Sequence, residues 1–469
     1  MSHRFGLALV TLCVMLSTAT AHDAPQAGSP AAALALLQDL VARDTSLGTG
    51  AVPAVADDLA HRFLAAGFAP SDVQVVRVAD TAALVVRYRG DGSGGAPIDL
   101  LGHLDVVPAS ARDWGRDPFK LVMDQGYLIG RGTLDVKGDI ALMITALLGL
   151  RAEGFVPTRD LNLVLTGDEE TTGLSSEALM ADHRELIAAE FALNADNLGG
   201  GTLDEVDGHP VLFRVQGSEK ASARFYLQTQ NAGGHSSQPR ADNAIYALAD
   251  ALKAVEHLRF PVRWNEWTLG DFAGTAPTVP GPLGEAMRRF AEHPEDVTAA
   301  ERLSQESVFI GRVRTTCVAT QIEGGHAPNA LPQHTKATLS CRIFPGDSMQ
   351  DVHDRLQAAV GPSVLVTDGE PIAPVASSPL RADVMAAVRA AVEATHPGAT
   401  VIPTQSSYAT DGATFRLGGI PTYGVGGLFI KESEQFAHGL NERIPLVSFD
   451  AGLDYWRLLI RRIAAAAPH

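Results

Sequence analysis

The chain has few basic residues and no long apolar run beyond its N-terminus. Lysine and arginine number 37 against 54 acidic residues, which gives a formal net charge of −17. A nucleic-acid partner would require a basic face, so we expect no nucleic-acid binding. A membrane-spanning helix takes about 20 apolar residues. No segment after residue 21 has that character, so we expect no membrane span in the mature chain.

Cysteine is also rare, with three residues in the whole chain. Cys13 lies in the apolar N-terminal stretch, and only Cys317 and Cys341 follow it. In an exported protein these two could form a disulfide. Two small buried apolar side chains fit the sequence equally well, because spacing alone does not fix a pairing. The sequence leaves the choice open.

The first 21 residues are typical of a secretory signal peptide. Arg4 precedes an apolar stretch from Phe5 to Leu16, and small residues end at Ala21. We expect cleavage after Ala21, which removes residues 1–21. A membrane anchor is the alternative, but the apolar stretch is shorter than the about 20 residues that a spanning helix needs. The sequence thus predicts a secreted or periplasmic protein.

The apolar pattern indicates an α/β fold with more than one domain, as expected for 469 residues. A helical pattern covers Ala31 to Gly67, and strands then alternate with helices in units of ~30 residues, which favours a mostly parallel sheet. From about residue 211 to 366, polar-alternating strands and two helices predict a smaller inserted α+β domain. The main domain then comprises residues 22–210 and 367–469. The pattern does not place the stretch from Gly274 to Phe309, which contains prolines and then becomes helical.

Five separate patches carry acids and histidines directly after short apolar runs or beside glycine. They are IDLLGHLDVVP with His103 and Asp105, GRGTLDVKGD with Asp135, LNLVLTGDEE with Glu169 and Glu170, FALNADN with Asp196, and FAHGLNE with His438. In open α/β sheets, functional side chains gather outside the carboxyl ends of strands. We therefore expect these side chains to meet at one edge of the sheet. Two imidazoles and several carboxylates suit a pair of zinc ions.

Asp135 is the candidate bridging ligand between the two ions. It lies in a turn at the start of an apolar helix, where a carboxylate is rigidly held. His103 would bind one ion through a ring nitrogen. Asp105, two residues later, would accept a hydrogen bond from that ring and fix its tautomer.

The remaining acids and His438 complete the expected site. Glu170 and His438 would bind one ion, and Asp196 would bind the other. Glu169 would face the water that zinc activates, take its proton and pass it to the leaving amine. Repulsion between Glu169 and Glu170, together with burial, is expected to raise their pKa values.

This ordered set resembles one family closely. HLDVVP, the W-x-x-DPF of Trp114 to Phe119, GRGTLDVKG, GDEE, NADN, GGHSS and a late H-x-x-NE look like the motifs of the dizinc exopeptidases and amidohydrolases. That family includes bacterial glutamate carboxypeptidase, aminoacylase, carnosinase and succinyl-diaminopimelate desuccinylase. The resemblance implies a zinc-peptidase catalytic domain that binds two zinc ions per subunit. It also implies that the inserted domain, residues 211–366, is a lid and dimerisation domain.

The resemblance also implies roles for three residues of the inserted domain. His235 in GGHSS resembles a lid histidine that reaches the active site of the partner subunit in a homodimer and binds the oxyanion. Arg342 in CRIFPG resembles an arginine that grips a substrate carboxylate with two hydrogen bonds. Asn329 in APNALP resembles a residue that the family often uses near substrate. The segment from Tyr408 to Phe415 departs from the usual glycine-threonine-aspartate arrangement, which leaves the substrate preference open.

We therefore predict an exported dizinc hydrolase that cleaves an amide next to a free carboxylate, as a dipeptidase or carboxypeptidase does. An N-acyl-amino-acid amidohydrolase is the alternative within the same chemistry. A dinuclear phosphoesterase would share such ligands, but the GDEE proton shuttle suits amide cleavage better. A non-catalytic binding protein is disfavoured because every expected ligand and the general base are present.

Overall fold

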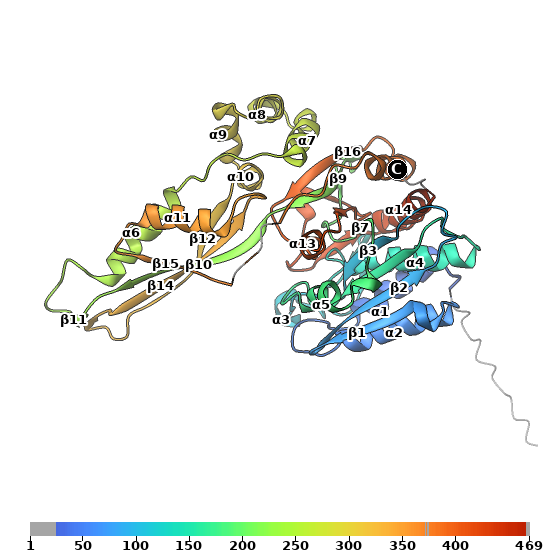
Figure 1. Ribbon diagram of the computed structural model, residues 1–469, viewed down its shortest axis with the longest axis horizontal. Helices are drawn as coiled ribbons and strands as arrows, with labels where there is room; N and C mark the ends of the chain where they lie inside the picture. The colour runs from blue at the N-terminus through green and yellow to red at the C-terminus, as the bar shows by residue number, and fades with distance from the viewer. Residues whose placement is uncertain (1–24, 371, 373–374, 466–469) are drawn as a thin grey trace, which may run out of the picture.

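The computed structural model describes residues 25–370, 372 and 375–465. The predicted signal peptide, residues 1–21, lies outside the described residues. Figure 1 shows a large body built on one twisted sheet and an elongated second body that extends from it. In the described part of the chain, we find no helix with the length and apolarity to cross a membrane.

The large sheet has ten strands in the order β1-β2-β6-β3-β7-β17-β9-β8-β18, with β16 paired to β9. Strands β6, β3, β7 and β17 run parallel to one another at its centre. This confirms the predicted α/β class with a mostly parallel sheet. The strands are β1 (Val73–Val78), β2 (Thr81–Tyr88), β3 (Ile98–His103), β6 (Leu161–Thr166), β7 (Phe191–Asn194), β8 (Gly201–Leu203), β9 (Pro210–Glu219), β16 (Thr400–Ser406), β17 (Thr422–Gly424) and β18 (Phe429–Lys431).

Helices cover both faces of this sheet, so its central strands are buried along their whole length. Every residue of β3 and β6 is buried, as the continuous apolar runs of a covered parallel strand predict. Leu100 packs into one core and its neighbour Leu101 into the other. The first core involves α1 (Pro30–Val41), α2 (Val52–Ala65), α4 (Lys137–Ala152), α12 (Ala382–Thr395) and α14 (Leu446–Ala464), and the second involves α5 (Leu174–Asp182) and α13 (Gly412–Leu417).

The helical pattern expected from Ala31 to Gly67 is interrupted, because α1 and α2 are separate helices. In the loop between them, the Asp44 side chain accepts a hydrogen bond from the backbone N–H of Ser46. Such a local bond offers the backbone an alternative to the helix. Thr45 donates to the carbonyl oxygen of Leu104, which ties this loop to the segment that follows β3.

The second body contains an antiparallel four-stranded sheet in the order β12-β14-β10-β15. Its helices pack on one face around an apolar core of their own. The small sheet begins at Ala221, because the residues before it form β9 of the large sheet. Its elements are β10 (Ala221–Gln230), α6 (Ala244–His257), β12 (Thr316–Gly324), β14 (His334–Ile343), α11 (Met349–Val360) and β15 (Leu365–Asp368), with the short pair β11 (Gly234–His235) and β13 (Ala330–Leu331).

Four helices between α6 and β12 account for the stretch that the sequence pattern did not place. Their apolar core contains Phe272, Phe290 and Leu303. A Cβ atom on Gly274 of α7 would lie 2.2 Å from the side chain of Ile402 in β16, so glycine permits this close packing. Figure 1 shows α7 beside β16. The helices are α7 (Glu266–Thr275), α8 (Gly281–Glu292), α9 (Val297–Ser304) and α10 (Ser307–Val313).

The pairing of the two late cysteines, which the sequence left open, is resolved by the small sheet. Cys317 of β12 and Cys341 of β14 lie opposite each other and are joined by a disulfide. The bond links residues 24 positions apart. A cross-link of this span restricts the unfolded chain and stabilises the sheet edge.

Replacing both Cys317 and Cys341 with alanine should destabilise the small sheet by about 3 kcal/mol. The loss of stability should appear as faster amide hydrogen exchange in β14 of the variant than in β14 of the wild-type protein. Reductant should make the wild-type protein resemble the variant and should leave the variant itself unchanged. Equal exchange in both proteins would show that the disulfide contributes nothing to the stability of this sheet.

Candidate metal centre

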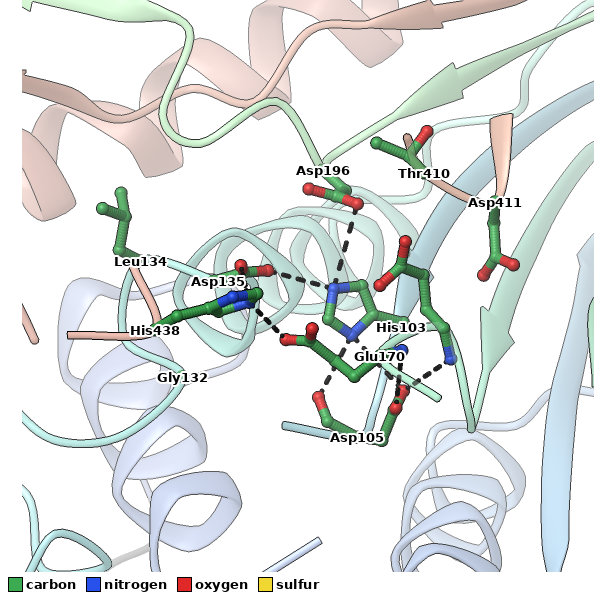
Figure 2. Close-up of polar contacts among 12 residues, drawn as sticks. His103, Asp105, Gly132, Leu134, Asp135, Glu170, Asp196, Thr410, Asp411 and His438 are labelled. Carbon is green, nitrogen blue, oxygen red and sulfur yellow. Dashed lines mark hydrogen bonds and ion pairs between the residues drawn. The ribbon is translucent and has the colours of Figure 1, made fainter. Parts of the chain in front are cut away.

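Three neighbouring parallel strands deliver the first predicted ligands to one edge of the large sheet. His103 is the last residue of β3, Glu169 and Glu170 follow β6, and Asp196 follows β7. Strand β3 lies between β6 and β7, so their carboxyl ends are adjacent, where open α/β sheets place their sites. Figure 2 shows the labelled side chains of these segments converging on His103.

Asp135 lies between two histidines that come from distant parts of the chain. Its Oδ1 atom is 3.1 Å from Nε2 of His103, and its Oδ2 atom is 3.0 Å from Nε2 of His438. Asp135 is mostly buried, and the peptide bond that follows it is cis. One carboxylate thus presents its two oxygens to two separate imidazoles (Figure 2).

The predicted ligands form two groups that share Asp135. One ligand atom from each of His103, Asp135 and Asp196 lies within 4.8 Å of the others, and the same holds for Asp135, Glu170 and His438. Nε2 of His438 is also 3.0 Å from Oε1 of Glu170. Two triads of nitrogen and oxygen donors joined by one carboxylate suit a pair of divalent cations. We call these five residues and Glu169 the ligand cluster.

Burial and crowding of like charges shift the pKa values of the ligand cluster. Burial raises the pKa of Glu169 to about 10, and the negative charges of Asp196 and Asp411 add to the effect. Hydrogen bonds to Asp135 and Glu170 raise the pKa of His438 to about 10. The cluster therefore retains protons at neutral pH, and bound cations would supply that positive charge in their place.

Asp105 contacts both His103 and the Glu169–Glu170 pair. Its Oδ1 atom lies 3.4 Å from Nδ1 of His103, and its backbone oxygen lies 3.1 Å from the same nitrogen. The carboxylate also accepts hydrogen bonds from the backbone N–H groups of Glu169, at 3.1 Å, and Glu170, at 3.0 Å. Asp105 thus fixes the backbone of one pair of acids and the ring of one histidine.

Glu442 holds the loop that carries Asp135, a role that the sequence analysis did not assign. This fully buried carboxylate accepts backbone hydrogen bonds from Gly132 at 3.0 Å, Leu134 at 2.8 Å and Asp135 at 3.0 Å. It also pairs with Arg131 at 2.7 Å. The available signal was the H-x-x-NE motif, in which Glu442 is the final residue.

Arg131 connects the Asp135 loop to the His438 loop. Its other terminal nitrogen donates to the carbonyl oxygens of His438, at 3.4 Å, and Gly439, at 3.3 Å. The same two loops are joined by a three-stranded sheet of β4 (Val122–Asp124), β5 (Tyr127–Ile129) and β19 (Arg443–Pro445). The chain therefore sets the separation of Asp135 and His438 through backbone contacts.

The three site residues predicted in the inserted domain do not join the ligand cluster of their own chain. His235 is exposed on β11, and the backbone oxygen of Asn329 accepts a hydrogen bond from the neighbouring Ser236. Figure 1 places β11 at the outer end of the second body, away from β3 and β7. Arg342 lies near the other end of β14, opposite Ser222, close to where the chain leaves the large sheet.

The segment from Tyr408 to Phe415 contributes two further residues beside the cluster. Asp411 is buried and accepts a hydrogen bond from Thr166 at the end of β6; Figure 2 shows Asp411 near His103. Burial raises the pKa of the Tyr408 phenol well above its usual value, and the charges of Asp196, Glu219 and Asp135 raise it further. In the sequence this segment departs from the motif of the resembled family, and the motif assigns no role to either residue.

The fold and this cluster define a metal-dependent hydrolase of the exopeptidase or amidohydrolase class. The sequence model of peptidase family M20/M25/M40 matches residues 100–462. The chain belongs to this family, which confirms the resemblance seen in its motifs.

Named relatives are similar to this chain at low identity. The probable carboxypeptidase S-like 2 of Dictyostelium discoideum is 27% identical over 403 residues, which cover 81% of this chain and 74% of that protein. The N-fatty-acyl-amino acid synthase/hydrolase PM20D1 of Homo sapiens is 27% identical over 377 residues, which cover 76% and 72%. A crystal structure of the M20 family metallo-carboxypeptidase Sso-CP2 from Sulfolobus solfataricus superposes with a TM-score of 0.68 at 15% identity, over 92% of this chain and 99% of that one. That structure is similar in fold.

Replacing Glu442 with glutamine should weaken metal binding by about tenfold or more, since residues behind metal ligands typically contribute 10- to 100-fold. The variant keeps the shape of the side chain but removes the charge that Arg131 requires and one of the acceptor oxygens. A competition titration with a chromophoric chelator measures the affinity. Glu393→Gln on the exposed side of α12 makes the same chemical change away from the site, and its affinity should equal that of the wild type. Unchanged affinity in Glu442→Gln would remove Glu442 from the support of the metal centre.

Proposed function

We propose that this chain is a dizinc hydrolase that cleaves an amide or peptide bond next to a free carboxylate. His103 and Asp196 would hold one zinc ion, Glu170 and His438 the other, and Asp135 would bridge them. The observation that supports this assignment most directly is the position of the two Asp135 oxygens, 3.1 and 3.0 Å from different histidines. Zinc binds imidazole nitrogens and carboxylate oxygens together and is usually coordinated by few ligands.

Glu169 is the proposed general base. When bound, two zinc ions supply Lewis-acid chemistry that acidifies water and polarises the scissile carbonyl. Glu169 then takes a proton from the attacking water and returns it to the leaving nitrogen. Its backbone N–H donates to Asp105, so the side chain starts from a fixed point next to the five proposed metal ligands. Asp105 also orients the His103 ring through Nδ1.

The substrate is a small peptide or an N-acyl amino acid. The names of the relatives cover both, since one is described as a carboxypeptidase and another as an N-fatty-acyl-amino acid synthase/hydrolase. Arg342 is the proposed partner of the substrate carboxylate. It is half-buried on β14 without a hydrogen-bond or ion-pair partner among the described residues. A guanidinium in this state offers two parallel donors to a carboxylate.

The second body is the proposed lid and dimerisation domain of a homodimer. Strand β12 is an edge strand of the small sheet, and most of its residues are exposed. Ile322 pairs with the buried Ala337 and so lies on the helix-covered side, yet it remains 66% exposed. An exposed edge with apolar side chains favours pairing with another strand, and a second copy would bring His235 and Asn329 toward the opposite metal centre.

Export to an oxidising compartment is also proposed. The predicted signal peptide lies outside the described residues, so the support comes from the Cys317–Cys341 disulfide. Disulfides persist in secreted and periplasmic proteins and are rare in reducing compartments.

Replacing Glu169 with glutamine should lower turnover at least about a hundredfold, the usual contribution of a positioned general base. Metal content should stay at two zinc ions per chain, because glutamine keeps the packing and Glu169 is not a proposed ligand. Amide hydrolysis and elemental analysis of the same samples measure the two quantities. Glu177→Gln, on the exposed side of α5, should match the wild type in both. A variant at Glu169 that keeps most of its activity would exclude the residue as the proton carrier.

Mixing two inactive variants tests the contribution of the partner subunit. Subunits with His235→Ala and subunits with Glu169→Gln should regain about a quarter of wild-type activity, because half of the mixed dimers are heterodimers with one intact site each. Assay after denaturation and joint refolding measures the rescue. Dimers that carry both substitutions in every subunit should stay inactive. Absence of rescue would contradict a histidine supplied in trans.

A further inference from the structure

A cavity of about 360 Å³ lies beside the ligand cluster. Its inner wall comes from segments that also carry site residues: Asn197 follows Asp196, and Tyr408 comes shortly before Asp411. Asn197 is the residue directly after the proposed ligand Asp196, so this wall of the cavity adjoins the ligand cluster through the backbone that follows β7. A volume in this range is typical of a small-molecule site.

The outer wall of the cavity is formed by the four helices α7 to α10, which we call the helical insertion. Val308 and Arg312 of α10 line it, together with Ile430 of β18 and Thr202 of β8. Val308 is 62% exposed although it is apolar. Helix α10 packs with α9 on the core of the four helices, and a Cβ atom on its Gly311 would lie 2.5 Å from Oγ of Ser407, directly after β16.

The charged side chains of this wall are already neutralised. Arg312 donates to Oδ2 of Asp271 at 2.8 Å. Arg214 pairs with Glu432 at 3.2 Å. The other residues that line the cavity are uncharged. A substrate carboxylate would find no free cation in this cavity, whereas Arg342 on the lid remains unpaired among the described residues.

We propose that this cavity binds the acyl side of the substrate, the half remote from the free carboxylate, as an uncharged group whose length is limited by Val308 of α10. This inference rests on the proposed amide hydrolysis. An uncharged acyl group enters without leaving a buried charge unpaired, which would be costly. A free ammonium group on this side of the substrate would find no unpaired carboxylate among the residues that line the cavity, since Glu432 pairs with Arg214. Both a fatty acyl chain and the penultimate residue of a peptide with a blocked amino group are uncharged acyl groups of this kind.

The experiment compares Val308→Trp with Val297→Trp. Both valines are exposed, at 62% and 69%, and both belong to the insertion, but Val297 does not line the cavity. The substrates share one C-terminal amino acid and carry acetyl, octanoyl or acetyl-leucyl groups. In Val308→Trp the ratio of kcat/KM for a long group to that for acetyl should fall about tenfold or more, the usual effect of pocket size. Val297→Trp should keep the wild-type ratio.

The two long substrates distinguish the sources of the acyl group. If Val308→Trp lowers the octanoyl-to-acetyl ratio of kcat/KM, the cavity binds acyl chains. If it lowers the acetyl-leucyl-to-acetyl ratio, the cavity binds peptides. An unchanged ratio for both in Val308→Trp would overturn the inference, as would a wild-type preference for dipeptides with a free amino group over all three substrates.

Binding separates this inference from the proposed function. In the Glu169→Gln background, calorimetry with the same three compounds needs no turnover. Affinity should rise with acyl length in the presence of Val297→Trp but not in the presence of Val308→Trp. If affinity depends on acyl length in this way but the wild-type protein hydrolyses none of the three compounds, the proposed hydrolysis is refuted and the cavity assignment is supported. Length-independent affinity in both variants would refute the cavity assignment even if hydrolysis occurs.

Discussion

The concentration of negative charge around His103 is the constraint on which the rest of the structure depends. Asp135, Glu170 and Asp196 lie within ligand distance of two histidines, and Glu169 and Asp411 are close behind them. Burial alone disfavours so many ionised carboxylates in one place. In the chain by itself, protons on the histidines and on Glu169 offset part of this repulsion. Divalent cations would offset it more fully, since each carries two charges and binds several oxygens at once.

A site of this kind requires a scaffold that does not relax when its charges repel. Two different devices meet this need. On one side, three parallel strands bring His103, Glu170 and Asp196 to fixed neighbouring positions, and their backbones are held by continuous sheet hydrogen bonds. On the other side, Asp135 and His438 come from loops, which are held by the buried pair of Glu442 and Arg131. The pair is stable in the interior because backbone N–H groups satisfy the carboxylate as well.

The parallel strands and the Glu442–Arg131 pair differ in how well they can be predicted from the sequence. Buried parallel strands are visible in the sequence as continuous apolar runs such as IDLL and LNLVL. The sheet edge at which the acids after these strands meet could therefore be predicted from the pattern alone. The loop device depends on contacts between residues 131–135 and 438–442, which no local pattern specifies. Glu442 was visible only as the last letter of a motif. Likewise, β9 was not recognised as a strand of the large sheet, because its pairing partners lie elsewhere in the chain.

The helical insertion shows a further limit of sequence reasoning. Helices α8 and α9 are short and amphipathic, so their pattern indicates helices but not the surface on which the four helices α7 to α10 pack. That surface is set by close backbone approach at Gly274 to β16, a tertiary feature. It has a functional consequence, because the same packing brings α10 to the rim of the site.

The arrangement separates two requirements that amide hydrolysis makes of one protein. The reacting atoms need rigid positions, which the large sheet and the Glu442 pair supply. Substrate choice needs surfaces that can vary without disturbing those positions. The second body, the proposed lid, carries Arg342, and helix α10 carries Val308, and neither belongs to the strands that hold the ligand cluster. A change in α10 therefore alters the cavity while the distances around Asp135 stay as they are. This division gives a physical reason why relatives described as acting on different substrates can retain the same fold.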